Sequence, residues 1–304
     1  MLDVISNDKL TWFDIVDVTE DDFYTLNKYN YDFHELDKKD CLSIEQCRPK
    51  IEQYDDYRFV ITHFPVEKKD NKGSIRLSMN ELYFFWGENY LITIHSSEMS
   101  WLTNYFKQEK NGTIKKSPQS VDQLLYAILQ NVVSQMRPIM SNIRYGIEKI
   151  DDNYGNERPE DVIKQISELR RNIIFLQSTL KPQKNIFAAF EKMQDQQEKN
   201  MDAYWGNIGD FLGKMMDMAE DDQELLEGLY SSIDTLLTFR TNKIMKILAM
   251  ITVISLPLTT ISGFYGMNVP LPFQNSINAI WGIISVMVIF CVIAVVLLIK
   301  INKN

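Results

Sequence analysis

Oxygen-bearing, small and apolar side chains recur every three or four residues near the C-terminal end of the chain. That spacing places them on one face of a helix, and their amide and hydroxyl oxygens can accept hydrogen bonds from a hydrated cation. The members of this set are Asn242, Met245, Ala249, Thr252, Leu256, Thr259 and Gly263. The competing interpretation is packing, because apolar, threonine and glycine residues on one face of a membrane helix commonly contact other helices.

The helix that carries this face belongs to a long uncharged stretch. Residues 247–299 contain no Asp, Glu, Lys, Arg or His. Because roughly 20 apolar residues span a bilayer core, these about 53 residues predict two crossings and a tight connection. The expected segments are a first crossing at 240–264, an outer loop at 265–278, a second crossing at 279–300 and a tail at 301–304.

Charge orients this hairpin and limits the partners of the chain. Residues 240–304 hold five basic residues and no acid, whereas residues 1–239 hold 27 basic and 41 acidic residues. The basic residues flank the crossings and are missing from the connection, so the positive-inside rule places both termini in the cytoplasm of a multi-pass plasma-membrane protein. The acidic body disfavours a nucleic-acid partner and favours a cation.

The remainder predicts a mixed domain followed by long helices. In residues 1–118, β-rich runs include 58–64, which Pro65 is expected to stop, and Thr19 is the expected N-cap of a helix that leads toward Leu36. In residues 119–239, apolar stripes predict a helix over 121–147 and a second one that Pro182 interrupts. A third helix is predicted from about Asp202 into the membrane, with a stripe at Phe211, Met215, Met218, Leu225, Leu229, Ile233 and Leu236.

Several motifs together resemble the CorA family of divalent-cation channels. The most specific is Tyr265-Gly266-Met267-Asn268, which follows residues 256–259 (LPLT) and lies between the two predicted crossings. Residues 48–57 (RPKIEQYDDY), 169–171 (LRR) and 181–183 (KPQ) extend the similarity over almost the whole chain. The resemblance implies an α+β membrane protein that forms a homopentamer. The architecture that the resemblance implies is an N-terminal cytoplasmic α/β/α domain, a long stalk helix and two C-terminal transmembrane helices.

The resemblance also implies a function and roles for residues. Family members carry Mg²⁺ into cells, often with Co²⁺ and Ni²⁺, without an enzymatic activity or an organic cofactor. Around a fivefold axis each residue of the helix face becomes a ring that lines a pore, and Tyr265, Gly266, Met267 and Asn268 form its selectivity filter. We expect the passive flow to be driven by the membrane potential.

Cytoplasmic divalent ions bound between protomers hold the family's pore closed. A row of acids at spacings of seven, four and three is a candidate regulatory Mg²⁺ site between neighbouring protomers, and a solvated helix face is the alternative. The row consists of Asp210, Asp217, Asp221 and Glu224.

One departure from the family pattern leaves the ion preference open. The outer loop at 269–275 (VPLPFQN) contains no carboxylate, whereas the family's best-known members have a Met-Pro-Glu-Leu sequence there. A ZntB-like zinc transporter or a Co²⁺/Ni²⁺ importer is the alternative within transport. A membrane-anchored scaffold or sensor without a pore is the alternative from another class.

Overall fold

The computed structural model describes residues 1–7, 9–69, 75–114, 116–192, 201–269 and 276–303. The chain divides into two compact units, Met1–Tyr230 and Ser231–Asn304.

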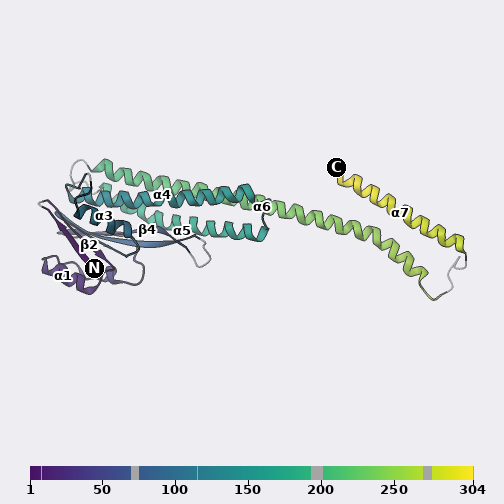
Figure 1. The fold of residues 1–304 in the computed structure, drawn as a ribbon, viewed down its shortest axis with the longest axis horizontal. Coiled ribbons are helices and arrows are strands. Elements are labelled where there is room, and N and C mark those ends of the chain that lie inside the picture. Colours follow the sequence, from purple (N-terminus) through teal and green to yellow (C-terminus); the bar gives the residue numbers. More distant parts are fainter. Residues whose placement is uncertain (8, 70–74, 115, 193–200, 270–275, 304) are drawn as a thin grey trace. The chain divides into compact units, whose positions relative to one another are not determined.

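The first unit is built on a six-stranded sheet (Figure 1). Its strands lie in the order β1-β2-β6-β5-β4-β3, and every neighbouring pair is antiparallel except β2 and β6. The strands are β1 (Leu2–Ser6), β2 (Thr11–Val16), β3 (Lys50–Gln53), β4 (Tyr57–Lys69), β5 (Ile75–Gly87) and β6 (Tyr90–His95). β5 ends at Gly87 and β6 begins at Tyr90, so a tight turn joins these two antiparallel strands.

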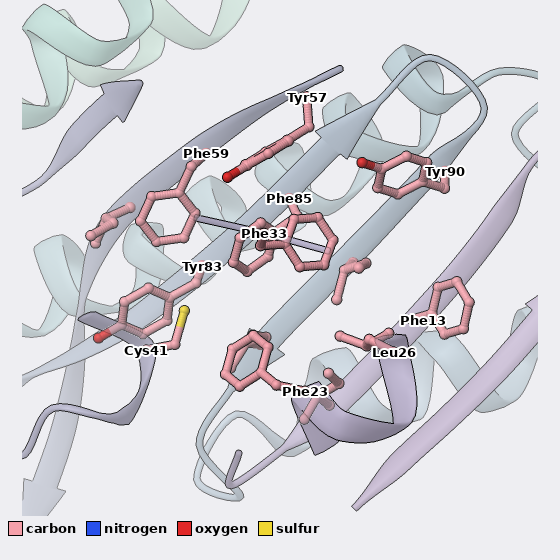
Figure 2. Packing of buried hydrophobic residues seen from close by; sticks show 14 residues of the cluster. Phe13, Phe23, Leu26, Phe33, Cys41, Tyr57, Phe59, Tyr83, Phe85 and Tyr90 are labelled. Carbon is pink, nitrogen blue, oxygen red and sulfur yellow. The ribbon is translucent and has the colours of Figure 1, made fainter. Parts of the chain in front are cut away.

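Helices cover both faces of this sheet. α1 (Glu20–Lys28) and α2 (Glu35–Leu42) pack on one face, where Phe33 lies over Phe85 with the ring centroids 4.1 Å apart (Figure 2). α3 (Ser100–Lys110), α4 (Val121–Asn153) and α5 (Pro159–Lys192) contact the sheet on the other face, where Trp12 meets Phe106. The predicted α/β/α arrangement is therefore observed.

The predicted helix toward Leu36 is wrong in its length. Thr19 is the N-cap, as expected, and forms a capping box with Asp22. However, α1 ends at Lys28 and the chain turns at Asn30, whose φ is +63°. Asparagine adopts this left-handed conformation more readily than most residues. A second short helix, α2, then starts after His34, whose Nδ1 accepts a hydrogen bond from the amide of Leu36.

Two proline breaks that the sequence predicts do not occur. β4 continues through Pro65, which pairs with Met79. On its other side, β4 is paired with β3 only as far as Ile61. Among the described strands, none borders that side of β4 beyond Ile61, so Pro65 lies on an open edge, where proline is tolerated. α5 likewise continues through Pro182, because buried side chains beyond it, such as Phe187 and Phe190, hold the next turns against the domain.

α6 (Asp202–Tyr265) begins in the first unit and continues into the second. Its first part packs against α4 and α5, where Trp205 stacks on Phe190 at 5.1 Å between ring centroids. The buried stripe differs from the predicted one: Leu225 and Leu236 are exposed. The buried members are Leu212, Met215, Ala219, Asp222, Leu226, Leu229 and Ile233. Because Leu225 and Leu226 are adjacent, the sequence alone leaves open which of them lies on the buried face of α6. In the structure Leu226 is buried and Leu225 is exposed.

The second unit consists of the end of α6 and α7 (Ile277–Lys303). Among the described residues, one helix, Ala203–Tyr265, contains a segment that is long and apolar enough to cross a membrane. The apolar part of α7, Ile280–Ala294, is shorter. The apolar segment at the end of α6 fits the predicted long helix that enters the membrane. That the chain crosses the membrane twice stays a prediction.

Candidate functional site

All seven residues of the predicted pore face lie on α6 and are exposed in the single chain. The most apolar 18-residue window of this helix is 0% buried. Such a helix is stable in a membrane only if lipid or other helices cover it. The exposed members of the face are Asn242, Met245, Ala249, Thr252, Leu256, Thr259 and Gly263.

The two threonines of this face have their hydroxyl protons engaged within the helix. Thr252 donates to the carbonyl of Leu248 and Thr259 donates to that of Ser255, each at 2.9 Å. With the proton fixed in this way, the hydroxyl oxygen offers only lone pairs to the outside. A hydrated cation presents water O–H groups outward, so acceptor oxygens of this kind match its shell.

The tetrapeptide at residues 265–268 ends the helix. Tyr265 is the last helical residue, and the amide of Gly266 donates to the carbonyl of Ser262 at 2.9 Å. A Cβ at Gly266 would lie 3.1 Å from the same carbonyl oxygen, so the tight turn favours glycine. Met267 and Asn268 follow with exposed side chains. The predicted acid-free loop lies, from Pro270 to Asn275, outside the described residues.

The predicted regulatory acids lie together on the solvent-exposed side of α6. Within the described part of one chain, no three His, Cys, Asp or Glu side chains meet in a metal-binding arrangement. The row consists of Asp210, Asp217, Asp221 and Glu224.

The sequence interpretation missed a buried acid one residue away from this row. Asp222 is 0% exposed, and Nε of Arg144 on α4 lies 2.6 Å from its Oδ1. Burial raises the pKa of Asp222, and the positive charge of Arg144 lowers it. The signal was present in the sequence, because Asp222 occupies an otherwise apolar stripe with Ala219 and Leu226.

Comparison with known proteins assigns the family. The model of the family described as "CorA-like Mg2+ transporter protein" matches residues 7–300. The chain belongs to the CorA family. CorA proteins are transporters rather than enzymes, which confirms the expectation that this chain is not an enzyme.

Individual relatives agree with this assignment. The putative metal ion transporter YfjQ of Bacillus subtilis is 28% identical over 243 residues, which is 78% of this chain and 72% of that protein. The cobalt/magnesium transport protein CorA of Thermotoga maritima is 24% identical over 300 residues, covering 97% of this chain and 82% of the relative. The solved structure of the CorA magnesium transporter from Methanocaldococcus jannaschii superposes with a TM-score of 0.81 at 23% identity, covering 97% and 92% of the two chains. That likeness shows the shared fold.

Proposed function

We propose that this chain forms a homopentameric channel that lets hydrated Mg²⁺ flow passively into the cell. The observation that carries the proposal is α6, an unbroken helix with exposed acceptor oxygens at Thr252 and Thr259 that ends directly in the family tetrapeptide. The proposed domains are 1–118, 119–239, 240–264, 265–278, 279–300 and 301–304. Both crossings lie in the plasma membrane, and both termini are cytoplasmic.

Five copies of α6 around an axis convert each side chain into a ring. Asn268 supplies amide oxygens at the outer entrance, and Thr259 and Thr252 supply hydroxyl oxygens deeper in. Since Mg²⁺ loses its waters reluctantly, several weak sites that bind its water shell allow the ion to enter and to leave. Leu256 and Met245 form apolar rings that close the pore by excluding water.

The membrane potential supplies the driving force. Moving a divalent ion inward releases about 4.6 kcal/mol per 100 mV, twice the value for a single charge. Divalent ions bound between the acidic rows of neighbouring stalks hold the helices together and close the pore. When the internal concentration falls, these sites empty, the rows repel each other and the pore opens.

Purified full-length protein in liposomes tests the proposal. Its mass in mild detergent is expected to be that of a pentamer, and an inside-negative potential is expected to drive Mg²⁺ uptake. A parallel series with Co²⁺, Ni²⁺ and Zn²⁺ gives the ion preference. A monomer without flux for any of the four ions contradicts the channel and favours a scaffold, and uptake of Zn²⁺ alone favours the zinc alternative.

A further inference from the structure

Three basic residues lie on α6 immediately before its apolar segment. They are Arg240, Lys243 and Lys246, and all three side chains are exposed. The nearest acidic residue before them in the sequence is Asp234. We call these three residues the basic stripe.

The length of the apolar segment places the stripe at a defined depth. From Ile247 to Tyr265 the helix rises about 28 Å at 1.5 Å per residue, which matches a hydrocarbon core of about 30 Å. The turns that carry Arg240 and Lys243 then lie in the headgroup layer when the segment spans the membrane. This depth rests on the membrane placement in the proposed function, and the direction of the stripe is measured from the proposed pore face.

The direction of the stripe distinguishes it from the pore face. At about 100° per residue, Arg240 and Lys243 each point about 150° away from the mean direction of the seven pore-face residues. Lys246 points about 90° away from the same direction. Positive charges on the pore side would repel the transported cation, whereas on the outer side they face lipid headgroups.

We propose that the basic stripe binds the headgroups of anionic phospholipids in the inner leaflet. The stripe combines positive charge, exposure, headgroup depth and an outward direction, and these properties fit a phosphate that carries a net negative charge. Lys and Arg near a membrane surface each contribute roughly a fivefold preference for anionic lipid. Three of them together give a preference on the order of 100-fold at low salt.

The test measures lipid binding and does not depend on ion flux. Purified full-length protein in neutral detergent receives phosphatidylglycerol, phosphatidylcholine or inorganic phosphate, and bound lipid is counted by native mass spectrometry. The wild type is expected to retain phosphatidylglycerol over phosphatidylcholine, and the R240Q/K243Q/K246Q variant is expected to lose that preference by on the order of 100-fold. The matched control K164Q/R171Q/K181Q removes the same charge from exposed positions on α5 and should behave as the wild type.

A second variant separates charge from folding. R240K/K243R/K246R keeps the charge and is expected to bind phosphatidylglycerol as the wild type does, and high salt should weaken that binding. The proposal is overturned if the glutamine variant retains the lipid preference or if phosphatidylcholine binds equally well. It is also overturned if inorganic phosphate displaces the lipid at equal concentration, because the site would then recognise free phosphate. Loss of Mg²⁺ flux with intact lipid preference contradicts the channel and leaves this inference standing.

Discussion

Arg144 on α4 lies with its Nε 2.6 Å from Oδ1 of Asp222 on α6. The carboxylate is completely buried, and its two oxygens have no well-aligned hydrogen bond from any described residue. Asp222 is therefore held by charge. The pair connects the helix that carries the acidic row to the helical layer of the first unit, so its strength matters for any movement of α6.

Removing the cation should cost more than removing the acid. Arg144→Met leaves the buried carboxylate of Asp222 without its partner, so the free energy of unfolding should fall by about 3–5 kcal/mol. Asp222→Asn removes the buried negative charge and should lower the free energy of unfolding by less. Urea unfolding of the full chain in detergent, followed by tryptophan fluorescence, measures both. Arg171→Met, at an exposed position on α5, is the control, and an equal loss in the control and in Arg144→Met would contradict the argument.

A buried carboxyl in the sheet domain predicts a pH dependence. Asp37 on α2 is 0% exposed and accepts hydrogen bonds from the hydroxyls of Tyr54 at 3.1 Å and Tyr57 at 2.9 Å. Burial raises the pKa of Asp37 to about 6, and the neighbouring Glu52 contributes to the rise. Because the folded state binds this proton more tightly than the unfolded chain does, stability falls as the pH rises from the ordinary value near 3.8 toward 6.

Glu52 opposes this trend only at lower pH. Hydrogen bonding to Lys50 lowers the pKa of Glu52 despite burial. Well above its ordinary value of 4.5, Glu52 is therefore ionised in both the folded and the unfolded state, and Asp37 sets the sign of the pH dependence. Hydrogen exchange of the α2 amides, corrected for the intrinsic pH dependence, should show declining protection from pH 5 to 7. Asp37→Asn should abolish this decline, and the exposed control Asp21→Asn should retain it. If protection of the α2 amides declined as much in Asp37→Asn as in the wild type, the pH dependence would come from another titratable group.

The sequence predicted the long helices better than it predicted their interruptions and faces. The apolar stripe that predicts the helix over 121–147 is buried throughout, because a regular apolar repeat leaves one orientation for a helix. Its nine members are Val121, Leu124, Leu125, Ile128, Val132, Met136, Ile139, Ile143 and Ile147. Pro65 and Pro182 were misjudged, since an edge strand and a well-packed helix both tolerate a lost hydrogen bond. The face of α6 was ambiguous where apolar residues stand side by side, and only contacts with α4 and α5 resolve it.

Some features of the candidate site could be predicted from the sequence, and others could not. The helix face and the tetrapeptide were visible in the sequence because both are local patterns. The Arg144–Asp222 pair was not visible, because its members are far apart in the sequence and meet only through packing. The ring geometry of the pore depends on other copies of the chain and stays a prediction.

The acidic row predicts a loss of inhibition when its charge is removed. If divalent ions bridge the rows of neighbouring stalks, Asp210→Asn/Asp217→Asn should raise the internal Mg²⁺ concentration needed for half inhibition by about tenfold, which corresponds to about 1.4 kcal/mol of lost site energy. Flux from liposomes preloaded with graded Mg²⁺ measures it. Asp151→Asn/Asp152→Asn removes the same charge from exposed positions on α4 and should have no effect. Unchanged inhibition in the first variant would favour a merely solvated face.

The hydroxyl of Thr259 predicts a difference between two conservative variants. Thr259→Val keeps the shape and removes the acceptor oxygen, so Mg²⁺ flux should fall by about fivefold to tenfold, the value of one net hydrogen bond. Thr259→Ser keeps the oxygen and should retain most of the flux. The ratio of initial rates in liposomes measures the effect, and equal rates for the two variants would show that Thr259 only packs.

The most direct measurement of the channel concerns the amide at the outer entrance. Mg²⁺ flux of Asn268→Ala in liposomes is compared with that of Asn278→Ala, which removes the same side chain from an exposed position at the start of α7. The proposed function predicts at least a tenfold loss in Asn268→Ala, because five amide acceptors disappear from the entrance, and wild-type flux in Asn278→Ala. Wild-type flux in Asn268→Ala, with the oligomer intact, would contradict it.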